Sequence, residues 1–311
     1  MLRSSECWTW PAKRISESFV NQTGDHFGGL PYAALDDVIE RALREDLSLG
    51  DATTDALIPA ELPGAANLVA RSTGVLAGVE AACEVFRRVD ASIVAEPLVK
   101  DGLRLEPGQA IARVSGSMAG ILKAERTALN LLQRMSGIAT MTAELVDAVK
   151  GTNARIIDTR KTAPGLRALD KYSVTAGGGA NHRFNLGDLV LIKDNHIEAL
   201  AAEGLGLTDV VRRARQNARH NLRIEVEVET VDQAGEALEG GADIILLDNM
   251  SPADMRKAVE LVAGRALTEA SGDISMATVR AAAESGVDLI SVGALTHSVK
   301  ALNIALDYEA Q

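Results

Sequence analysis

The sequence predicts an α/β protein built from two parts, residues 31–136 and residues 137–297. In the first part, short apolar runs are broken by Gly and Pro around one helix-like piece. In the second part, strand-like runs alternate with helical stretches long enough for crossover connections. Repeated alternation of this kind is typical of a parallel sheet, and many such units in succession predict a closed or nearly closed barrel.

The first part is predicted to be a small sheet with helices packed on it. Residues 34–46 carry apolar side chains at helical spacing, which predicts a helix. Residues 65–115 contain the short runs NLVA, GVLAGV, SIVAE and AIARVSG, with a helical pattern near 80–90. A long helix is predicted over 117–149, where Leu, Ala and Met recur as apolar anchors. The whole pattern is typical of an α+β layer.

Six apolar runs of the second part are predicted to be its strands. They are RIID (155–158), LVLIK (189–193), RIEVEVE (223–229), DIILLD (243–248), RALTEA (265–270) and LISVG (289–293). The last stretch, 297–309, is predicted to be a helix. As a C-terminal helix over 298–311, it could pack back on the first part.

Composition argues against several classes of protein. A net charge of -11 argues against nucleic acid as the main partner. No apolar run is long enough to span a bilayer, so no membrane association is expected. Cys7 and Cys83 are too few for a disulfide framework or a zinc cluster, which favours a cytoplasmic location. Residues 1–30 lack the apolar core of a signal peptide and are expected to be a disordered leader.

Residues 155–193 form a basic segment in an acidic chain, with seven basic and three acidic side chains. A local positive region of this kind predicts an anionic ligand. Three of its cations end or closely follow an apolar strand, where barrel enzymes place functional groups: Arg160, Lys161 and Lys193. Arg167 and Lys171, at i,i+4 spacing, are explained equally well as solvated helix charges.

The segment TAGGGANHRF (175–184) contains three consecutive glycines followed by a basic pair. Three consecutive glycines are costly unless the backbone needs positive φ or a close approach. His182 and Arg183 come directly after it, and the planar guanidinium of arginine suits a carboxylate. We therefore expect this loop to bind an acidic group.

The strand RIEVEVE places three carboxylates on one face, because side chains alternate along a strand. Glu225, Glu227 and Glu229 are predicted to point into the barrel, with Arg160, Lys161 and Lys193 as the balancing cations. Glu225 and Glu229 are expected to have ion-pair roles within the strand. Glu227, together with Asp248 at the end of the next strand, is predicted to be functional and to suit Mg²⁺, ribose hydroxyls or a developing cation.

Two late loops are predicted to hold a phosphate. Ser271-Gly272 follows one strand, and Gly293-Ala294 follows the next and leads into a helix. Small residues at such positions leave backbone N–H groups free to bind an anion. With the basic segment and the two carboxylates, the residues predict transfer of a phosphorylated sugar to an acidic acceptor.

These motifs, in order and spacing, resemble the quinolinate phosphoribosyltransferase family over nearly all of residues 31–309. The main block is TRKTAPGLRALDKYSVTAGGGANHRFNLGDLVLIKDNHI (159–197). The others are EDLSLGDATT (45–54), ERTALN (125–130), EVEVET (225–230), LLDN (246–249), EASGDI (269–274) and VGALTHS (292–298).

The resemblance implies an N-terminal open-faced α/β sandwich, an incomplete α/β barrel, and a homodimer or homohexamer whose sites are completed by the neighbouring subunit. It implies that phosphoribosyl pyrophosphate and quinolinate give nicotinate mononucleotide, CO₂ and pyrophosphate in de novo NAD biosynthesis, with Mg²⁺ as cofactor. The pyridine nitrogen would attack the anomeric carbon through an oxocarbenium-like state. The new pyridinium nitrogen would then serve as the electron sink for loss of the 2-carboxylate.

The resemblance also implies roles for particular residues. Catalytic roles fall on Glu227, Asp248, Lys161 and Lys193, and Mg²⁺ would be held by Glu227 and Asp248, mainly through substrate or water. Substrate contacts fall on Arg126, Thr159, Arg160, Lys161, His182, Arg183, Lys193, Glu227, Asp248, Ser271, Gly272, Asp273, Val292, Gly293, Ala294 and His297. Arg126 would reach the site of the neighbouring subunit.

Two positions depart from the family pattern, and three other functions remain open. Asp273 stands where the family often has glycine, and Thr175 stands where it usually has arginine. One alternative is a related phosphoribosyltransferase-like enzyme with another acceptor, such as the molybdenum-transport-associated relatives. A Schiff-base aldolase that uses Lys161 or Lys193 is a second alternative, and a non-catalytic binding protein is a third.

Overall fold

The computed structural model describes residues 32–309, so the leader expected over residues 1–30 lies outside them. Its helices are α1 (Tyr32–Leu47), α2 (Ala52–Leu57), α3 (Val79–Val89), α4 (Met118–Ala148), α5 (Arg167–Ala176), α6 (Asp194–Ala201), α7 (Leu207–Asn217), α8 (Val231–Gly240), α9 (Pro252–Val262), α10 (Val279–Glu284) and α11 (Ala294–His297). Its strands are β1 (Pro63–Ala70), β2 (Gly74–Val75), β3 (Val94–Pro97), β4 (Arg104–Leu105), β5 (Ala110–Ser117), β6 (Arg155–Ile157), β7 (Val190–Ile192), β8 (Ile224–Val228), β9 (Ile244–Asp248), β10 (Leu267–Ser271), β11 (Leu289–Ser291) and β12 (Ile304–Tyr308).

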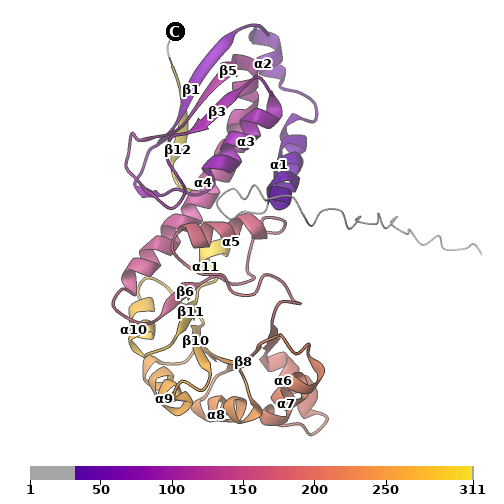
Figure 1. Cartoon of the computed structure of the whole chain (residues 1–311), viewed down its shortest axis with the longest axis vertical. Coiled ribbons are helices and arrows are strands. Elements are labelled where there is room, and N and C mark those ends of the chain that lie inside the picture. Colours follow the sequence, from indigo (N-terminus) through magenta and orange to yellow (C-terminus); the bar gives the residue numbers. More distant parts are fainter. Residues whose placement is uncertain (1–31, 310–311) are drawn as a thin grey trace, which may run out of the picture.

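The N-terminal part is an antiparallel sheet of order β12-β1-β5-β3 with helices packed on it (Figure 1). Apolar side chains from the sheet and from α3 and α4 form one core, which includes the fully buried Leu68, Phe86, Ile111 and Leu132. Because small aliphatic residues dominate this core, the layers pack closely, and burial of their apolar surface stabilises the sheet.

Helix α4 joins the two parts of the molecule. Its first half packs against α3 and β5, and its second half packs against α5, β6 and α10 (Figure 1). Ile121 and Leu132 belong to the N-terminal core, whereas Ile138 and Leu145 belong to the core of the barrel. Within residues 32–309, α4 and every other helix lack the combination of length and apolar character that crossing a bilayer needs.

The C-terminal part is a six-stranded parallel sheet of order β6-β11-β10-β9-β8-β7. Within residues 32–309, β6 and β7 form the two edges and do not pair with each other, so the barrel is incomplete. Helices lie outside the curved sheet (Figure 1). The predicted α/β class, with a sandwich layer and an incomplete barrel, is confirmed.

Strand β8 shows the predicted alternation. Ile224, Val226 and Val228 are buried in the outer core between sheet and helices. Glu225 and Glu227 point to the opposite face, inside the barrel. Glu229 follows the strand and is exposed. The prediction that all three carboxylates enter the barrel is therefore confirmed for two of them and wrong for Glu229, because the strand ends at Val228.

The predicted C-terminal helix over 297–309, or 298–311, is wrong. Helix α11 ends at His297, and residues 304–308 form strand β12. This strand pairs antiparallel with β1, with Ala70 opposite Ile304 and Ala66 opposite Tyr308. The end of the chain does return to the first part, but as an edge strand that covers the backbone groups of β1.

Candidate active site

A cavity of about 540 Å³ opens at the carboxyl ends of the parallel strands. All strands of a parallel barrel end on the same side, so residues far apart in sequence meet there. Glu227 in β8, Asp248 in β9 and Ser271 in β10 all line the cavity. The lining consists of Thr159, Arg160, Lys161, His182, Arg183, Leu191, Lys193, Glu227, Leu246, Asp248, Asn249, Glu269, Ser271, Gly272, Asp273 and Ser291.

One side of the cavity is cationic. The Nη1 atom of Arg183 donates to the carbonyl oxygen of Leu189 at 3.0 Å, which holds the guanidinium in place. Burial and the charge of Arg160 lower the pKa of Arg183. The Nε atom of Arg160 is itself buried and has no hydrogen-bond partner within residues 32–309. Two neighbouring guanidiniums, one with an unused buried donor, are suited to an anion that supplies the missing acceptors.

His182 lies on the same side, with both ring nitrogens already engaged. Its Nε2 atom lies 2.9 Å from Oε2 of Glu225, and its Nδ1 atom accepts the N–H of Arg183 at 2.7 Å. The neutral ring therefore carries its hydrogen on Nε2. Burial lowers the pKa of His182, but the hydrogen bond and charge of Glu225, together with the charge of Glu269, give a net rise. A hydrogen bond from this ring to a substrate carboxylate would require Nε2 to leave Glu225.

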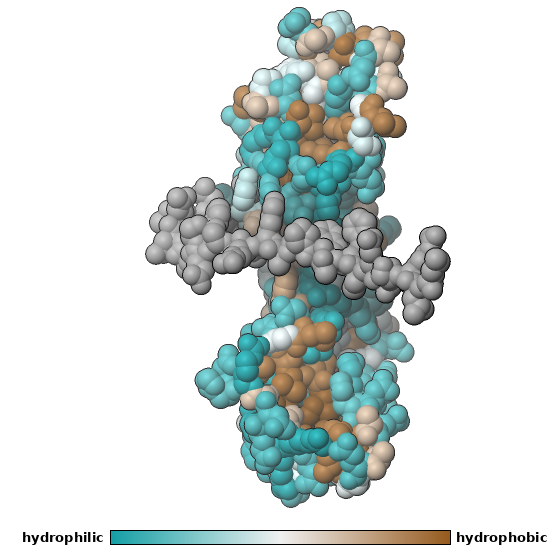
Figure 2. Space-filling view, turned by 90° about the vertical axis from the view of Figure 1, so that its right-hand side faces the viewer, coloured by the Kyte–Doolittle hydropathy of each residue, from teal (hydrophilic) through white to brown (hydrophobic). Residues whose placement is uncertain are grey.

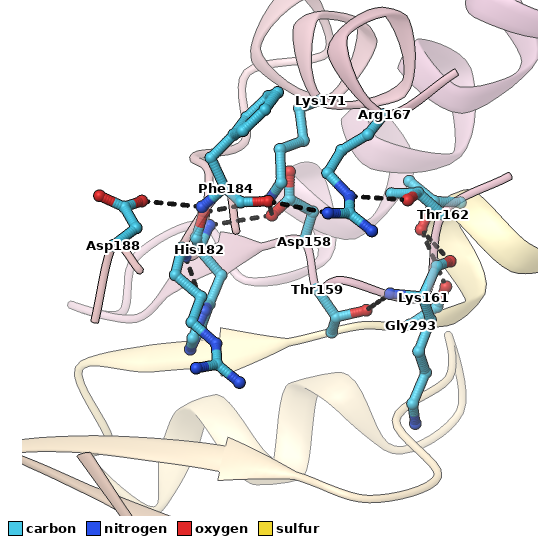
Figure 3. A network of polar contacts seen from close by, with 12 residues as sticks. Asp158, Thr159, Lys161, Thr162, Arg167, Lys171, His182, Phe184, Asp188 and Gly293 are labelled. Atoms are coloured by element: carbon cyan, nitrogen blue, oxygen red, sulfur yellow. Dashed lines mark hydrogen bonds and ion pairs between the residues drawn. The ribbon is translucent and has the colours of Figure 1, made fainter. Parts of the chain in front are cut away.

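A buried ion pair lies behind His182 (Figure 3). Lys171 of α5 is only 2% exposed and pairs with Asp158, which is fully buried just after β6. Burial raises the pKa of Asp158 and lowers that of Lys171, and each charge opposes the shift of the other. The interpretation of Lys171 as a solvated helix charge is therefore wrong, because α5 turns this side chain into the protein. Arg167 is not free either, since it donates to Thr162 and to the carbonyl of Phe184.

Another side of the cavity carries carboxylates. Oε2 of Glu227 accepts a hydrogen bond from Nζ of Lys193 at 3.0 Å, so the predicted balancing cation is confirmed for this carboxylate. Asp248 accepts a hydrogen bond from the side-chain amide of Asn249 at 2.8 Å. Both carboxylates remain on the cavity surface, where carboxylate oxygens can meet sugar hydroxyls or a hydrated Mg²⁺.

The loop after β10 has an unusual backbone beside these carboxylates. Gly272 has a φ of 89°, and a Cβ there would lie 2.1 Å from Oδ1 of Asn249, so only glycine fits. Asn249 and Asp273 also have positive φ, at 53° and 45°. The N–H of Asn249 donates to the carbonyl of Ser271 at 3.0 Å. The ends of β9 and β10 are thus held together where a phosphate was predicted.

Glu269 lines the inner end of the cavity, and Glu225 lies beside it outside the lining; both are almost completely buried. Their carboxylate oxygens make no hydrogen bond within residues 32–309 apart from the close approach of His182 to Glu225. Burial, and then the charge of Glu225, raise the pKa of Glu269 to about 8. One oxygen of each and a ring nitrogen of His182 lie within 4.8 Å of one another, a spacing that a metal ion could bridge. The hydrogen on Nε2 of His182 opposes a metal at that atom.

Five predicted substrate-binding residues are not part of the cavity lining. They are Arg126, Val292, Gly293, Ala294 and His297. Arg126 is exposed on α4, in the N-terminal part. Val292 is buried, and a Cβ on Gly293 would lie 3.0 Å from Cδ of Lys161, so this second loop lies beside the cavity. Thr175 is exposed on α5 and likewise lies outside the lining.

Five lining residues were not predicted from the sequence: Leu191, Leu246, Asn249, Glu269 and Ser291. The alternation of side chains along β10 could have predicted that Glu269 faces the cavity. Ser271 was predicted to face the cavity, and Glu269 lies two residues earlier on the same face of β10. Asn249 belongs to the LLDN motif, and its positive φ is a feature that asparagine tolerates better than most residues.

Two family models match the chain. The N-terminal domain of quinolinate phosphoribosyl transferase matches residues 51–136, and the C-terminal domain matches residues 138–307. The chain belongs to the quinolinate phosphoribosyl transferase family. The family resemblance stated from the sequence motifs is therefore confirmed.

Named relatives agree with this assignment. The chain is 46% identical over 282 residues to the nicotinate-nucleotide pyrophosphorylase [carboxylating] of Mycobacterium leprae, covering 89% of this chain and 98% of the relative. It is 44% identical over 263 residues to a probable nicotinate-nucleotide pyrophosphorylase of Bacillus subtilis, covering 85% and 89%. The solved nicotinate-nucleotide pyrophosphorylase of Francisella tularensis superposes with a TM-score of 0.84 at 35% identity, covering 92% and 100%.

Proposed function

We propose that this chain is a pentosyltransferase that moves the phosphoribosyl group of phosphoribosyl pyrophosphate to the nitrogen of quinolinate. CO₂ is lost, and nicotinate mononucleotide and pyrophosphate are the other products, as in de novo NAD biosynthesis. The observation that carries the proposal is the division of one cavity into a cationic side, with Arg160 and Arg183, and an acidic side, with Glu227 and Asp248. Family membership supports the same reaction.

The cationic side is suited to the acceptor, because quinolinate carries two carboxylates. Arg160 and Arg183 offer planar donor pairs, and Lys161, in the loop that follows β6, adds a third charge. Holding the pyridine ring by its carboxylates orients its nitrogen toward the acidic side. Positioning of this kind converts the encounter of two substrates into a reaction within one complex.

The acidic side is suited to the sugar. Positive charge develops at the anomeric carbon as the bond to pyrophosphate breaks, and the carboxylates of Glu227 and Asp248 are placed to stabilise it. Lys193, which pairs with Glu227, can turn toward the leaving pyrophosphate. The backbone around Ser271 and Gly272 would hold the 5-phosphate, and Asp273 would have to point its carboxylate away from it.

The donors of the acidic side also fit Mg²⁺. This ion prefers oxygen ligands, keeps several waters, and is commonly bound through one or two carboxylates together with substrate phosphates. Glu227 and Asp248 supply two carboxylates on the cavity surface. When bound, Mg²⁺ would neutralise charge on the pyrophosphate as it departs.

The same structure supports a shared site in a homodimer or larger ring. Arg126 lies in the N-terminal part, outside the lining, although the family resemblance implies that it contacts the acceptor. Apolar surface is visible on both parts in Figure 2, and Leu98 and Leu186 are 56% and 71% exposed. Exposed apolar patches of this kind mark interaction surfaces.

We place the enzyme in the cytoplasm, where the buried thiol of Cys83 would stay reduced.

The test is an assay of the purified protein with quinolinate, phosphoribosyl pyrophosphate and Mg²⁺. Release of CO₂ and formation of the mononucleotide are expected in equal amounts. Turnover of nicotinic acid or another base, without turnover of quinolinate, would instead indicate the related phosphoribosyltransferase with another acceptor. Trapping of a carbonyl substrate by borohydride would indicate the aldolase, and binding of substrates without turnover would indicate a binding protein.

A further inference from the structure

The loop of residues 181–188 carries two acceptor-side residues, yet apolar packing does little to hold its outer part. Phe184 and Leu186 are 46% and 71% exposed. A loop with few buried apolar contacts depends on polar contacts for its position. Figure 3 shows that such contacts converge on its first residues, where the buried ion pair of Asp158 and Lys171 lies.

Every backbone polar group of His182 is held by this pair. The N–H of His182 donates to Oδ1 of Asp158 at 2.9 Å, and Nζ of Lys171 donates to the carbonyl oxygen of His182 at 3.0 Å. The amide of Asn181, in the orientation that gives it partners, adds a hydrogen bond of 2.6 Å to Oδ2 of Asp158. Asp158 therefore accepts hydrogen bonds from three donors while it is fully buried.

The contacts continue from His182 into the cavity. The N–H of Arg183 donates to the ring of His182 at 2.7 Å, and the ring itself is held by Glu225. The Arg183 guanidinium then reaches the carbonyl of Leu189 at 3.0 Å and faces the cavity. The direction of Arg183 is thus determined by the peptide units on which Asp158 and Lys171 act.

We propose that Asp158 and Lys171 are positioning residues for the acceptor, because their buried ion pair fixes the backbone at His182 and thereby aims Arg183 at a substrate carboxylate. Neither residue is in the cavity lining. The inference rests on the proposed function, since it assigns these residues to recognition of the dicarboxylate. Replacing the pair by neutral side chains could leave the fold intact while the loop loses its anchor.

The test compares Asp158→Asn, Lys171→Met and the double variant D158N/K171M with the unchanged enzyme. Each single variant leaves one buried charge without its partner, so both are expected to unfold at lower temperature. The double variant leaves no unpaired charge, and its melting temperature is expected to recover. The KM for quinolinate is expected to rise about tenfold to a hundredfold in all three variants, because a small misplacement of a binding group has effects of that size. The KM for phosphoribosyl pyrophosphate should change little.

The double variant separates positioning from stability. If the KM for quinolinate recovered together with the melting temperature, the pair would be purely structural and the inference would be overturned. Equal rises in both KM values would overturn it as well. Titration calorimetry with quinolinate alone provides a second measurement that does not depend on turnover, and a weaker Kd is expected in the double variant.

Asp243→Asn is the matched control. Asp243 also pairs with a basic side chain, that of Arg215, and also accepts a backbone N–H, that of Ile224 at 2.7 Å. It precedes β9 and so lies at the opposite ends of the strands. This variant is expected to lose stability without a change in either KM. Failure of the unchanged protein to bind or turn over quinolinate would overturn the proposed function and the inference together, which distinguishes that result from a loss of the positioning effect alone.

Discussion

The two sides of the cavity are built differently. Residues of the cationic side follow β6 or lie in the loop of residues 181–188, and buried side chains such as Asp158 and Lys171 hold them from behind. Residues of the acidic side lie at the ends of the adjacent strands β8, β9 and β10, so the sheet itself places them. The difference teaches that the charge-stabilising groups are fixed by the barrel, whereas the acceptor-binding groups depend on a polar network that can be perturbed separately.

Among the residues that line the cavity, the largest effect is expected on the acidic side. Asp248→Asn keeps the shape of the side chain but removes the charge that would stabilise the anomeric carbon, so kcat should fall about 10²- to 10³-fold with a small change in either KM. Steady-state kinetics at saturating substrates would measure this. Asp243→Asn, at the other end of the same strand, should keep its kcat. A change confined to KM in Asp248→Asn would show that the carboxylate only binds substrate.

Substitutions on the cationic side should change the KM for quinolinate. Arg183→Ala removes a charged donor whose hydrogen bond is worth about 1.5–3 kcal/mol, so the KM for quinolinate should rise about tenfold to a hundredfold. Arg183→Lys should recover only part of this, because an ammonium cannot replace the planar fork. If kcat fell while the KM for quinolinate stayed the same, the proposed division of labour between the two sides would be wrong.

Arg126 tests whether each site is completed by the neighbouring subunit. Arg126→Ala alone should be inactive or nearly so if each site needs this residue from its neighbour. Mixing it with an inactive Asp248→Ala variant should restore part of the activity, since one hybrid site then has both residues. Subunit exchange would be verified by mass spectrometry. No recovery despite exchange would place Arg126 outside the site.

The smallest effect concerns stability at the inner end of the cavity. The pKa of Glu269 is raised from 4.5 to about 8, so between these pH values the folded protein binds more protons than the unfolded chain. Stability should therefore decline as pH rises from about 4.5 to about 8. Glu269→Gln should flatten this decline and gain a few degrees in Tm over the parent at pH 8, with little gain at pH 5. An equal gain at both pH values would contradict this origin.

The sequence predicted the parts of the site that depend on local patterns. Alternation along β8 placed Glu227 inside the barrel, and strand ends identified Asp248 and Ser271. Local patterns could not predict which distant segments of the chain come into contact. Lys171 looks like a surface charge at helical spacing, and only the packing of α5 against the end of β6 buries it with Asp158.

The error at the C-terminus has the same origin. Residues 304–308 alternate as a strand, with Ile304 and Leu306 buried, but they also fit a short helix. The unpaired edge of β1, far earlier in the chain, decides between the two, because pairing satisfies its backbone groups. Local propensity does not contain that information.

Strand β12 also orders events during synthesis of the chain. On the ribosome, β1, β5 and β3 emerge long before residues 304–308, so for most of translation β1 is an edge strand that lacks its second partner. An unpaired edge can recruit strands from other chains, and contacts between distant segments form slowly. The protein is therefore most exposed to aggregation while β12 has not yet been synthesised. Pairing of β12 with β1 ends that exposure.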